Sequence, residues 1–248
     1  MELLTTASST DIARQDPRIA VLPVGSFEQH GDHLPLTTDT VIACLIAHDL
    51  ADTYPLLLLP PVTISCSHEH EPSPGTVSLS HTTVTAIITD IRASLSRNGI
   101  NCLVLVNGHG GNYVLGNIAQ EANVDGRHVV LFPGRDDLTQ ARNAAGMETT
   151  SHDDMHGGEF ETSILLHAAP ELVRPTYRDA DHHAPDRAHL HLLGTAAYTS
   201  NGIIGRPSAA TAAKGKAALD SLTGSFATYL ALISDPTAEQ IDTPSLPD

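Results

Sequence analysis

Residues 102–112, Cys-Leu-Val-Leu-Val-Asn-Gly-His-Gly-Gly-Asn, contain the clearest candidate for a buried strand and the turn that follows it. The run at 102–106 is short and apolar throughout, which is typical of a strand that is covered on both faces. The glycines of the turn flank His109 and allow the backbone to approach a ligand closely. A helix is predicted directly afterwards, from about Tyr113 to Ala122. This strand–turn–helix unit indicates an α/β protein.

The same alternation of strands and helices continues along most of the chain. Further strands are predicted at residues 19–22, 56–59 and 128–132, and further helices at about 40–51, 82–95, 136–145, 159–167 and 209–232. Residues 170–205 mix proline, aspartate and histidine and are expected to be irregular. No repeat or long linker divides the chain, so residues 1–248 are predicted to form one domain with a mostly parallel sheet. The polar stretch at about 237–248 is expected to be a frayed tail.

Composition and charge exclude several classes of partner. The chain carries a formal net charge of −16, with 13 basic residues and no basic run, so neither nucleic acid nor an anionic membrane is an expected partner. No apolar run approaches the length of about 18 residues that a membrane span needs. Three widely spaced cysteines form no disulfide framework, and the N-terminus lacks the features of a secretory signal. These features predict a cytoplasmic protein.

Metal-ligating side chains are dense in the stretch that follows the first predicted strand. Glu28 and His30 are two residues apart, so they face the same way in an extended backbone. Asp39 stands where the next helix starts and could point back toward them. His33 is better placed to shape the loop than to bind a metal. The stretch therefore supplies several ligands of one site without completing it.

His109 follows a different strand but is expected at the same place. In parallel sheets, ligands bind outside the carboxyl ends of the strands. His109 could there join Glu28, His30 and Asp39 in an oxygen and nitrogen shell that suits zinc, manganese or iron. If one carboxylate bridges, two ions roughly 3.5–4 Å apart become possible.

Each of these residues also has an ordinary structural role. Asp39 alone could be only a helix cap, and His109 alone could be only a turn residue. Glu28 is harder to explain in that way, because a carboxylate beside a buried strand needs a partner.

A second candidate cluster precedes the helix predicted at 159–167. His156 stands in a glycine-rich loop, and Glu161 in the first helical turn could reach a cation, although glutamate is common in first turns without one. Residues 68–71, His-Glu-His-Glu, resemble ligand chemistry, but the prolines after them favour a solvated loop with a substrate-side or surface role. Neither a nucleophile elbow nor a nucleotide-binding glycine motif is present.

Three motifs occur in order: Glu28-Gln29-His30-Gly31 with Asp39, residues 107–112, and His156-Gly157-Gly158 with Glu161-Thr162-Ser163. Together they resemble the creatininase family of metal-dependent amidohydrolases. The resemblance implies a three-layer α/β/α sandwich with a mostly parallel central sheet. It also implies a homo-oligomer, often a hexamer built as a trimer of dimers. The implied site holds two ions of zinc, manganese or iron and hydrolyses C–N bonds in amides.

The resemblance also assigns roles to the ligands. Glu28, Asp39 and His109 look like one metal shell, and His30 with a bridging Asp39 looks like part of the other. Creatinine-cleaving members carry a glutamate two residues after the turn histidine, and this chain has Gly111 there.

Glu161 is the candidate replacement for that missing ligand. His156 resembles the histidine that handles protons, so His156 and Glu161 are the catalytic candidates. Because the chain has no tryptophan, it lacks the tryptophans that surround the substrate in creatinine hydrolases. Its Gly110-Gly111 turn resembles instead a formamide-cleaving deformylase and the peptidase that trims the mycofactocin precursor.

The expected function is therefore hydrolysis of a cyclic amide, a formamide or a small peptide by a metal-bound hydroxide, with creatinine itself disfavoured. In this reaction His156 would protonate the leaving nitrogen as a general acid. Two alternatives stay open: a non-catalytic metal-binding or ligand-binding protein on the same fold, and a plain structural α/β domain. In the last case, Glu28, His30 and His109 would lie far apart.

Overall fold

A parallel sheet of four strands lies at the centre of the fold, in the order β2-β1-β3-β4. The structure is a computed structural model that describes residues 4–234, so the predicted frayed tail at 237–248 lies outside the described residues. The strands are β1 (Ile19–Val24), β2 (Leu56–Leu58), β3 (Cys102–Asn107) and β4 (Val129–Phe132). In the register of β1 and β3, Val24 is opposite Asn107, so these two strands end at the same level.

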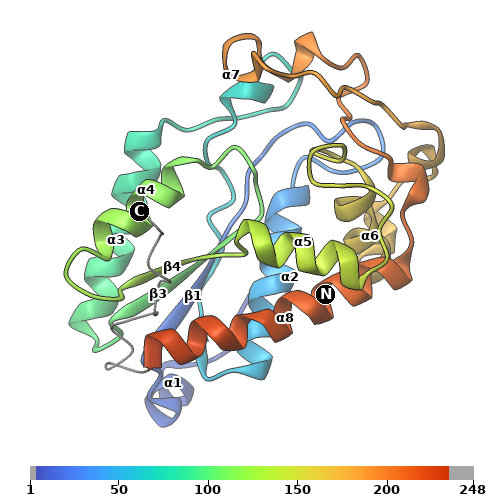
Figure 1. Cartoon of the computed structure of the whole chain (residues 1–248). Helices are drawn as coiled ribbons and strands as arrows, with labels where there is room; N and C mark the ends of the chain where they lie inside the picture. The colour runs from blue at the N-terminus through green and yellow to red at the C-terminus, as the bar shows by residue number, and fades with distance from the viewer. Residues whose placement is uncertain (1–3, 235–248) are drawn as a thin grey trace, which may run out of the picture.

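Helices cover both faces of the sheet and complete the predicted three layers. One face carries α2 (Thr38–Thr53), α5 (Arg135–Ala144), α6 (Glu159–Ala168) and α8 (Ala212–Ser234), and the other carries α3 (His81–Arg97) and α4 (Val114–Ala122) (Figure 1). The expected α/β/α sandwich with a parallel central sheet is confirmed. In the part of the chain that the structure describes, no helix is both long enough and apolar enough to cross a bilayer.

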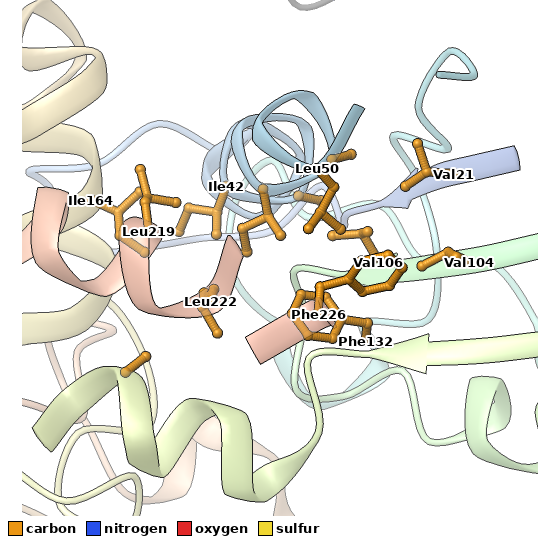
Figure 2. Close-up of a cluster of buried hydrophobic side chains, with 14 of the residues drawn as sticks. Val21, Ile42, Leu50, Val104, Val106, Phe132, Ile164, Leu219, Leu222 and Phe226 are labelled. Carbon is orange, nitrogen blue, oxygen red and sulfur yellow. The ribbon is translucent and has the colours of Figure 1, made fainter. Parts of the chain in front are cut away.

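Alternating side chains of the two central strands build two separate cores. Val21, Val104 and Val106 face α2, α6 and α8, and pack in a cluster with Leu222 and Phe226 (Figure 2). The intervening residues of β1 and β3 face α3 and α4. Because both faces of these strands are covered, their sequences are apolar without alternation, as in other parallel sheets.

The predicted elements match those of the structure, with shifts at their ends. The helix expected from residue 209 begins at Ala212, because Pro207–Ala209 forms a short 3-10 turn. Residues 170–205 are irregular as expected, and contain short 3-10 turns and the single-turn helix α7 (Leu190–Leu193). Helix α1 (Ser9–Gln15) was not predicted. It is stabilised by a capping box and buries no side chain, so it has no apolar periodicity to detect.

Two glycines bring the start of α2 against the ends of the central strands. A side chain at Gly25, after β1, would overlap the backbone of Thr40, and one at Gly108, after β3, would overlap the backbone of Asp39. Neither glycine has a positive φ, so space and not backbone conformation requires glycine there. The first turn of α2 thus lies directly over the carboxyl ends of β1 and β3.

The packing of α8 against the sheet can be tested with Phe226→Ala. The Phe226 ring is fully buried, 5.3 Å from the ring of Phe132 and 5.4 Å from that of Tyr54. We expect the free energy of unfolding, measured by urea denaturation, to fall by about 3–5 kcal/mol. Leu232→Ala on the same helix is the control, because Leu232 is 41% exposed and should cost much less. Equal losses in the two variants would contradict this account of the core.

Candidate metal centre

The polar residues of three separate motifs meet beyond the carboxyl ends of β1 and β3. Glu28 and His30 come from the loop after β1, Asp39 from the first turn of α2, and His109 from the turn after β3. His156 and Glu161 come from the loop before α6 and from its first turn, and all six residues lie in one cluster. The structure therefore brings together every candidate site residue of the sequence. The alternative in which Glu28, His30 and His109 lie far apart is wrong.

Glu28, Asp39 and His109 form the first group of ligand atoms. Nδ1 of His109 lies 3.2 Å from Oε1 of Glu28 and 3.3 Å from Oδ2 of Asp39. All three side chains are buried, and their ligand atoms fall within 4.8 Å of one another. This spacing allows the three side chains to bind one cation together.

Asp39 is shared with a second group, which contains His30 and Glu161. Its other oxygen, Oδ1, lies 3.0 Å from Nε2 of His30, and that nitrogen lies 4.0 Å from Oε1 of Glu161. The second nitrogen of His30, Nδ1, donates to the backbone carbonyl of Glu28 at 3.1 Å. Nε2 is thereby left to face the cluster. The two oxygens of Asp39 point to different imidazoles, as a bridging carboxylate requires.

Unpaired atoms in this cluster fit a cation. Among the described residues, Oε1 of Glu28, Oδ2 of Asp39 and Nε2 of His109 are buried without a hydrogen-bond partner. An unpaired buried carboxylate oxygen is costly, and a divalent ion would satisfy both oxygens at once. Carboxylate oxygen with imidazole nitrogen is a donor set that suits zinc and manganese. The residues present therefore fit two such ions, with Asp39 between them.

The electrostatics of the cluster show what compensates the buried carboxylates in the absence of a cation. Burial would lower the pKa of His30, but the Asp39 carboxylate outweighs it and the pKa is raised to about 10. Burial also opposes charge on His109, yet Glu28 and Asp39 raise the pKa of His109 well above its usual value. Burial would raise the pKa of Asp39, but His30 and His109 hold it well below its usual range. Protons on two imidazoles therefore take the place of positive ions.

The pKa of Glu161 is shifted in the opposite direction from that of Asp39. Burial raises the pKa of its carboxyl to about 7, with the neighbouring Asp39 carboxylate adding to the effect and His30 opposing it. The backbone N–H of Gly157 donates to its Oε2 at 2.6 Å, which holds Oε1 toward His30. A carboxyl held in this way gains most from a cation, because the cation would stabilise its charged form.

His156 is fixed in one tautomer by its surroundings. Its Nε2 lies 2.6 Å from the backbone carbonyl of Gln29, which can only accept, so Nε2 carries a proton and donates it there. Its Nδ1 faces Oε1 of Glu28 at 3.7 Å. Burial lowers the pKa of His156 well below its usual value, and the nearby His30 and His70 add to this. His156 is therefore a neutral base whose lone pair points into the cluster.

His70 and Glu69 also belong to the site, although the sequence analysis did not count them among the ligands. They lie on the 3-10 turn His68–His70. His70 is buried, and its Nε2 lies 3.4 Å from Oε1 of Glu28; Oε1 of Glu69 lies 3.3 Å from Nε2 of His109. Of the two roles expected for residues 68–71, a surface role fits the exposed His68 and Glu71, whereas His70 is buried and faces the site. Prolines directly after this turn gave the signal of a solvated loop, and no local pattern reveals its burial.

Further side chains support the cluster from outside. Ser26 donates to Oε2 of Glu28 at 2.8 Å and is also in contact with the hydroxyl of Ser67. This bond fixes the Glu28 carboxylate so that Oε1 faces the imidazoles. His33 is buried, and Nε2 of His33 pairs with the hydroxyl of Thr162 at 3.1 Å, outside both groups of ligand atoms. His33 thus holds its loop against α6.

Two adjoining cavities give access to the cluster. A small one of about 100 Å³ is lined by residues that include His109, His156 and Glu161. A larger one of about 420 Å³ lies outside it and is lined by Leu190, Leu192 and Leu193, among others. The two share a wall formed by four residues: Glu69, Gly111, Tyr113 and Leu190. The outer cavity therefore directly adjoins the inner one at the cluster.

An α/β protein with a buried two-centre cluster of carboxylates and imidazoles at its sheet edge belongs to the class of candidate metallohydrolases. The family model described as "Creatininase: Creatinine amidohydrolase" matches residues 3–230. The chain therefore belongs to the creatininase family of amidohydrolases, as its motifs predicted.

Individual relatives and structures agree with this family. The mycofactocin precursor peptide peptidase of Mycolicibacterium smegmatis is 34% identical over 223 residues, which cover 86% of this chain and 84% of that protein. Creatinine amidohydrolase of Pseudomonas putida is 30% identical over 173 residues, 62% of this chain and 66% of that protein. A tryptophan-to-phenylalanine mutant of creatininase has a TM-score of 0.77 at 25% identity, covering 93% of this chain and 98% of that one. A structure named Creatininase Mn has a TM-score of 0.74 at 26% identity, with coverages of 88% and 91%.

The role of Glu28 as a ligand can be tested with Glu28→Gln. Removal of a group that only supports a ligand typically costs about 10–100-fold in metal affinity, so loss of a ligand should exceed about 100-fold. Mn²⁺ and Zn²⁺ affinities, measured by competition with a chromophoric chelator, check this. Asp32→Asn is the matched control, since Asp32 lies in the same loop with a side chain that is 74% exposed. Unchanged metal affinity in the Glu28 variant would show that Glu28 is not a ligand.

Metal binding should release protons. Because the pKa of His30 is raised to about 10 by Asp39, His30 is protonated at pH 7 and must lose a proton before it can bind an ion. Metal affinity should therefore rise with pH until about pH 10. Isothermal titration in buffers of different ionisation enthalpy should show net proton release at pH 7. A binding enthalpy that is the same in all buffers would contradict the protonated imidazole.

Proposed function

We propose that this protein is a divalent-metal-dependent hydrolase that cleaves the amide C–N bond of a small peptide. The observation that carries the proposal is the arrangement around Asp39, whose two oxygens face the imidazoles of two different ligand groups. A carboxylate in that position would bridge two ions, and paired ions are a common device for hydrolysis. A structural helix cap would need neither imidazole.

The ligands divide between the two ions. Glu28, Asp39 and His109 would hold one, and His30, Asp39 and Glu161 would hold the other. In this arrangement Glu161 supplies the carboxylate for which position 111 has no side chain. The ions, when bound, would polarise the amide carbonyl and lower the pKa of water. Manganese or zinc suits the donor set, and manganese is also the metal in the name of the similar creatininase structure.

His156 would move the proton. Its neutral Nδ1 can accept a proton as water attacks the carbonyl carbon, and the same nitrogen can then donate that proton to the leaving nitrogen. The C–N bond breaks and leaves a carboxylate and an amine. His156 thus acts first as a base and then as the general acid that the sequence predicted.

A peptide amide is the favoured substrate class for two reasons. The peptidase relative has higher identity than the creatinine amidohydrolase, and over a larger share of this chain. The chain also has no tryptophan to surround creatinine. The adjoining cavities would place the amide in the inner cavity and an apolar part of the peptide in the outer one. A formamide is the second candidate, because it would need only the inner cavity.

We also propose an assembly and a location for the protein. We infer a homo-oligomer, as the resemblance to the creatininase family implies. A reducing cytoplasm suits the three cysteines, which are all unpaired and buried.

The proposed proton transfer can be tested with His156→Ala. Loss of a general acid–base group should lower kcat by about 10²–10⁴-fold while metal content stays that of the wild type. His152→Ala, at an exposed histidine of the same loop, should keep both. Turnover is measured on a panel of short peptides, formamides and lactams, before and after removal of metal with a chelator.

Wild-type activity should disappear with the chelator and return with Mn²⁺ or Zn²⁺. Cleavage that survives metal removal would contradict the proposed reaction. Metal binding without turnover of any panel member would favour the non-catalytic alternative.

A further inference from the structure

Glu69 lies behind His109, on the side away from the other ligands. It comes from the 3-10 turn His68–His70, outside the three motifs that mark the site. We propose that Glu69 is a positioning residue: it accepts the Nε2–H of His109 and thereby fixes Nδ1 as the atom that binds the metal. This inference rests on the proposed function, because it concerns the same metal centre.

The two side chains are in close contact, and Nε2 of His109 has no other acceptor among the described residues. Oε1 of Glu69 lies 3.3 Å from Nε2 of His109, while Nδ1 of His109 faces Glu28 and Asp39. Within residues 4–234, Nε2 is buried and has no aligned hydrogen-bond partner. Once Nδ1 binds an ion, the remaining ring proton must be on Nε2 and needs an acceptor. The Glu69 carboxylate is the group placed to supply it.

His30 and His156 show the same arrangement with other acceptors. Nδ1–H of His30 is accepted by the carbonyl of Glu28, and Nε2–H of His156 by the carbonyl of Gln29. Each ring therefore presents one defined nitrogen to the cluster. His109 lies within a glycine-rich turn, and among residues 4–234 no backbone carbonyl accepts from its outer nitrogen, so a side chain has to take this role. Acceptors of this kind fix the tautomer of a metal-binding histidine and raise its basicity.

Gly111 leaves the space in which His109 and Glu69 meet. A side chain at position 111 would overlap both Oε1 of Glu69 and Nε2 of His109. Gly111 does not have a positive φ, so its backbone conformation does not require glycine. The Glu69 carboxylate can therefore contact His109 only because position 111 carries no side chain.

Glu69 is itself held in place from a distant part of the chain. The hydroxyl of Thr195 donates to the backbone carbonyl of Glu69 at 3.0 Å. Gly194, with a φ of +70°, packs against the same carbonyl, where a side chain would be tightly placed. Thr195 is buried. A turn that is fixed at its backbone can present its carboxylate in one position, as a positioning residue must.

The test compares two variants of Glu69 with a control on the same turn. Glu69→Ala removes the acceptor, and we expect Mn²⁺ and Zn²⁺ to bind about 10–100-fold more weakly. Glu69→Gln keeps an acceptor oxygen and the shape of the side chain, so it should restore most of the affinity. Glu71→Ala, at the exposed end of the turn, should bind like the wild type. Affinities are measured on the full chain by chelator competition.

A second measurement reads the tautomer directly. In zinc-loaded protein, ¹⁵N NMR of the imidazoles should show His109 protonated at Nε2 in the wild type and in Glu69→Gln. In Glu69→Ala, we expect this signal to broaden or to be replaced by that of the other tautomer. A residue with a merely structural role would change the unfolding midpoint without changing this signal.

The outcomes separate this inference from the proposed function. If the wild type binds metal and Glu69→Ala binds it equally well with the same His109 tautomer, Glu69 has no positioning role and the proposed function stands. If the wild type binds neither ion, the proposed function fails and this inference fails with it. If Glu69→Ala does not fold, Glu69→Gln with wild-type affinity supports the acceptor role, and a Gln variant as weak as one that lacks Glu28 overturns it.

Discussion

The contact on which the site depends is that of the Asp39 carboxylate with two imidazoles from two different strand ends. Oδ1 lies 3.0 Å from His30, which follows β1, and Oδ2 lies 3.3 Å from His109, which follows β3. Asp39 can stand between them only because α2 starts directly above both strands. Gly25 and Gly108 permit that approach, since neither carries a side chain that would push the helix away. The strand order and the geometry of the site are therefore set by the same packing.

This arrangement gathers several ionisable groups in the interior of the protein, in contact with one another. A buried carboxylate without compensation would be strongly unfavourable, and Glu28, Asp39 and Glu161 lie within one cluster. Raised pKa values at His30 and His109 show how the protein compensates by holding protons. Divalent ions would do so more completely, because each would replace a proton and also reach the oxygens that have no partner. The fold is thus consistent with a site that exchanges protons for metal.

Much of the fold and part of the site could be predicted from the sequence, for identifiable physical reasons. Buried parallel strands are apolar on both faces, so β1 and β3 could be recognised as strands. Because ligands bind at the carboxyl ends of such strands, Glu28 and His109 were expected to lie close together. The 3-10 turn that carries Glu69 and His70 could not be predicted, because its burial comes from Thr195 and Gly194, more than a hundred residues later. Such long-range packing has no periodic signal. The tautomer of His156 likewise depends on one backbone carbonyl in a distant loop.

The surroundings of His156 restrict the direction of chemistry at this centre. Its ring lies between those of His30 and His70, with 4.2 Å between centroids on each side, so it cannot turn over. One nitrogen ends at the carbonyl of Gln29, which cannot pass a proton on. In the proposed reaction, a proton would therefore reach and leave the His156 ring through Nδ1 alone. If His156 transfers the proton as proposed, the departing nitrogen of a substrate must lie where the attacking water lost its proton, which limits the scissile bond to one orientation.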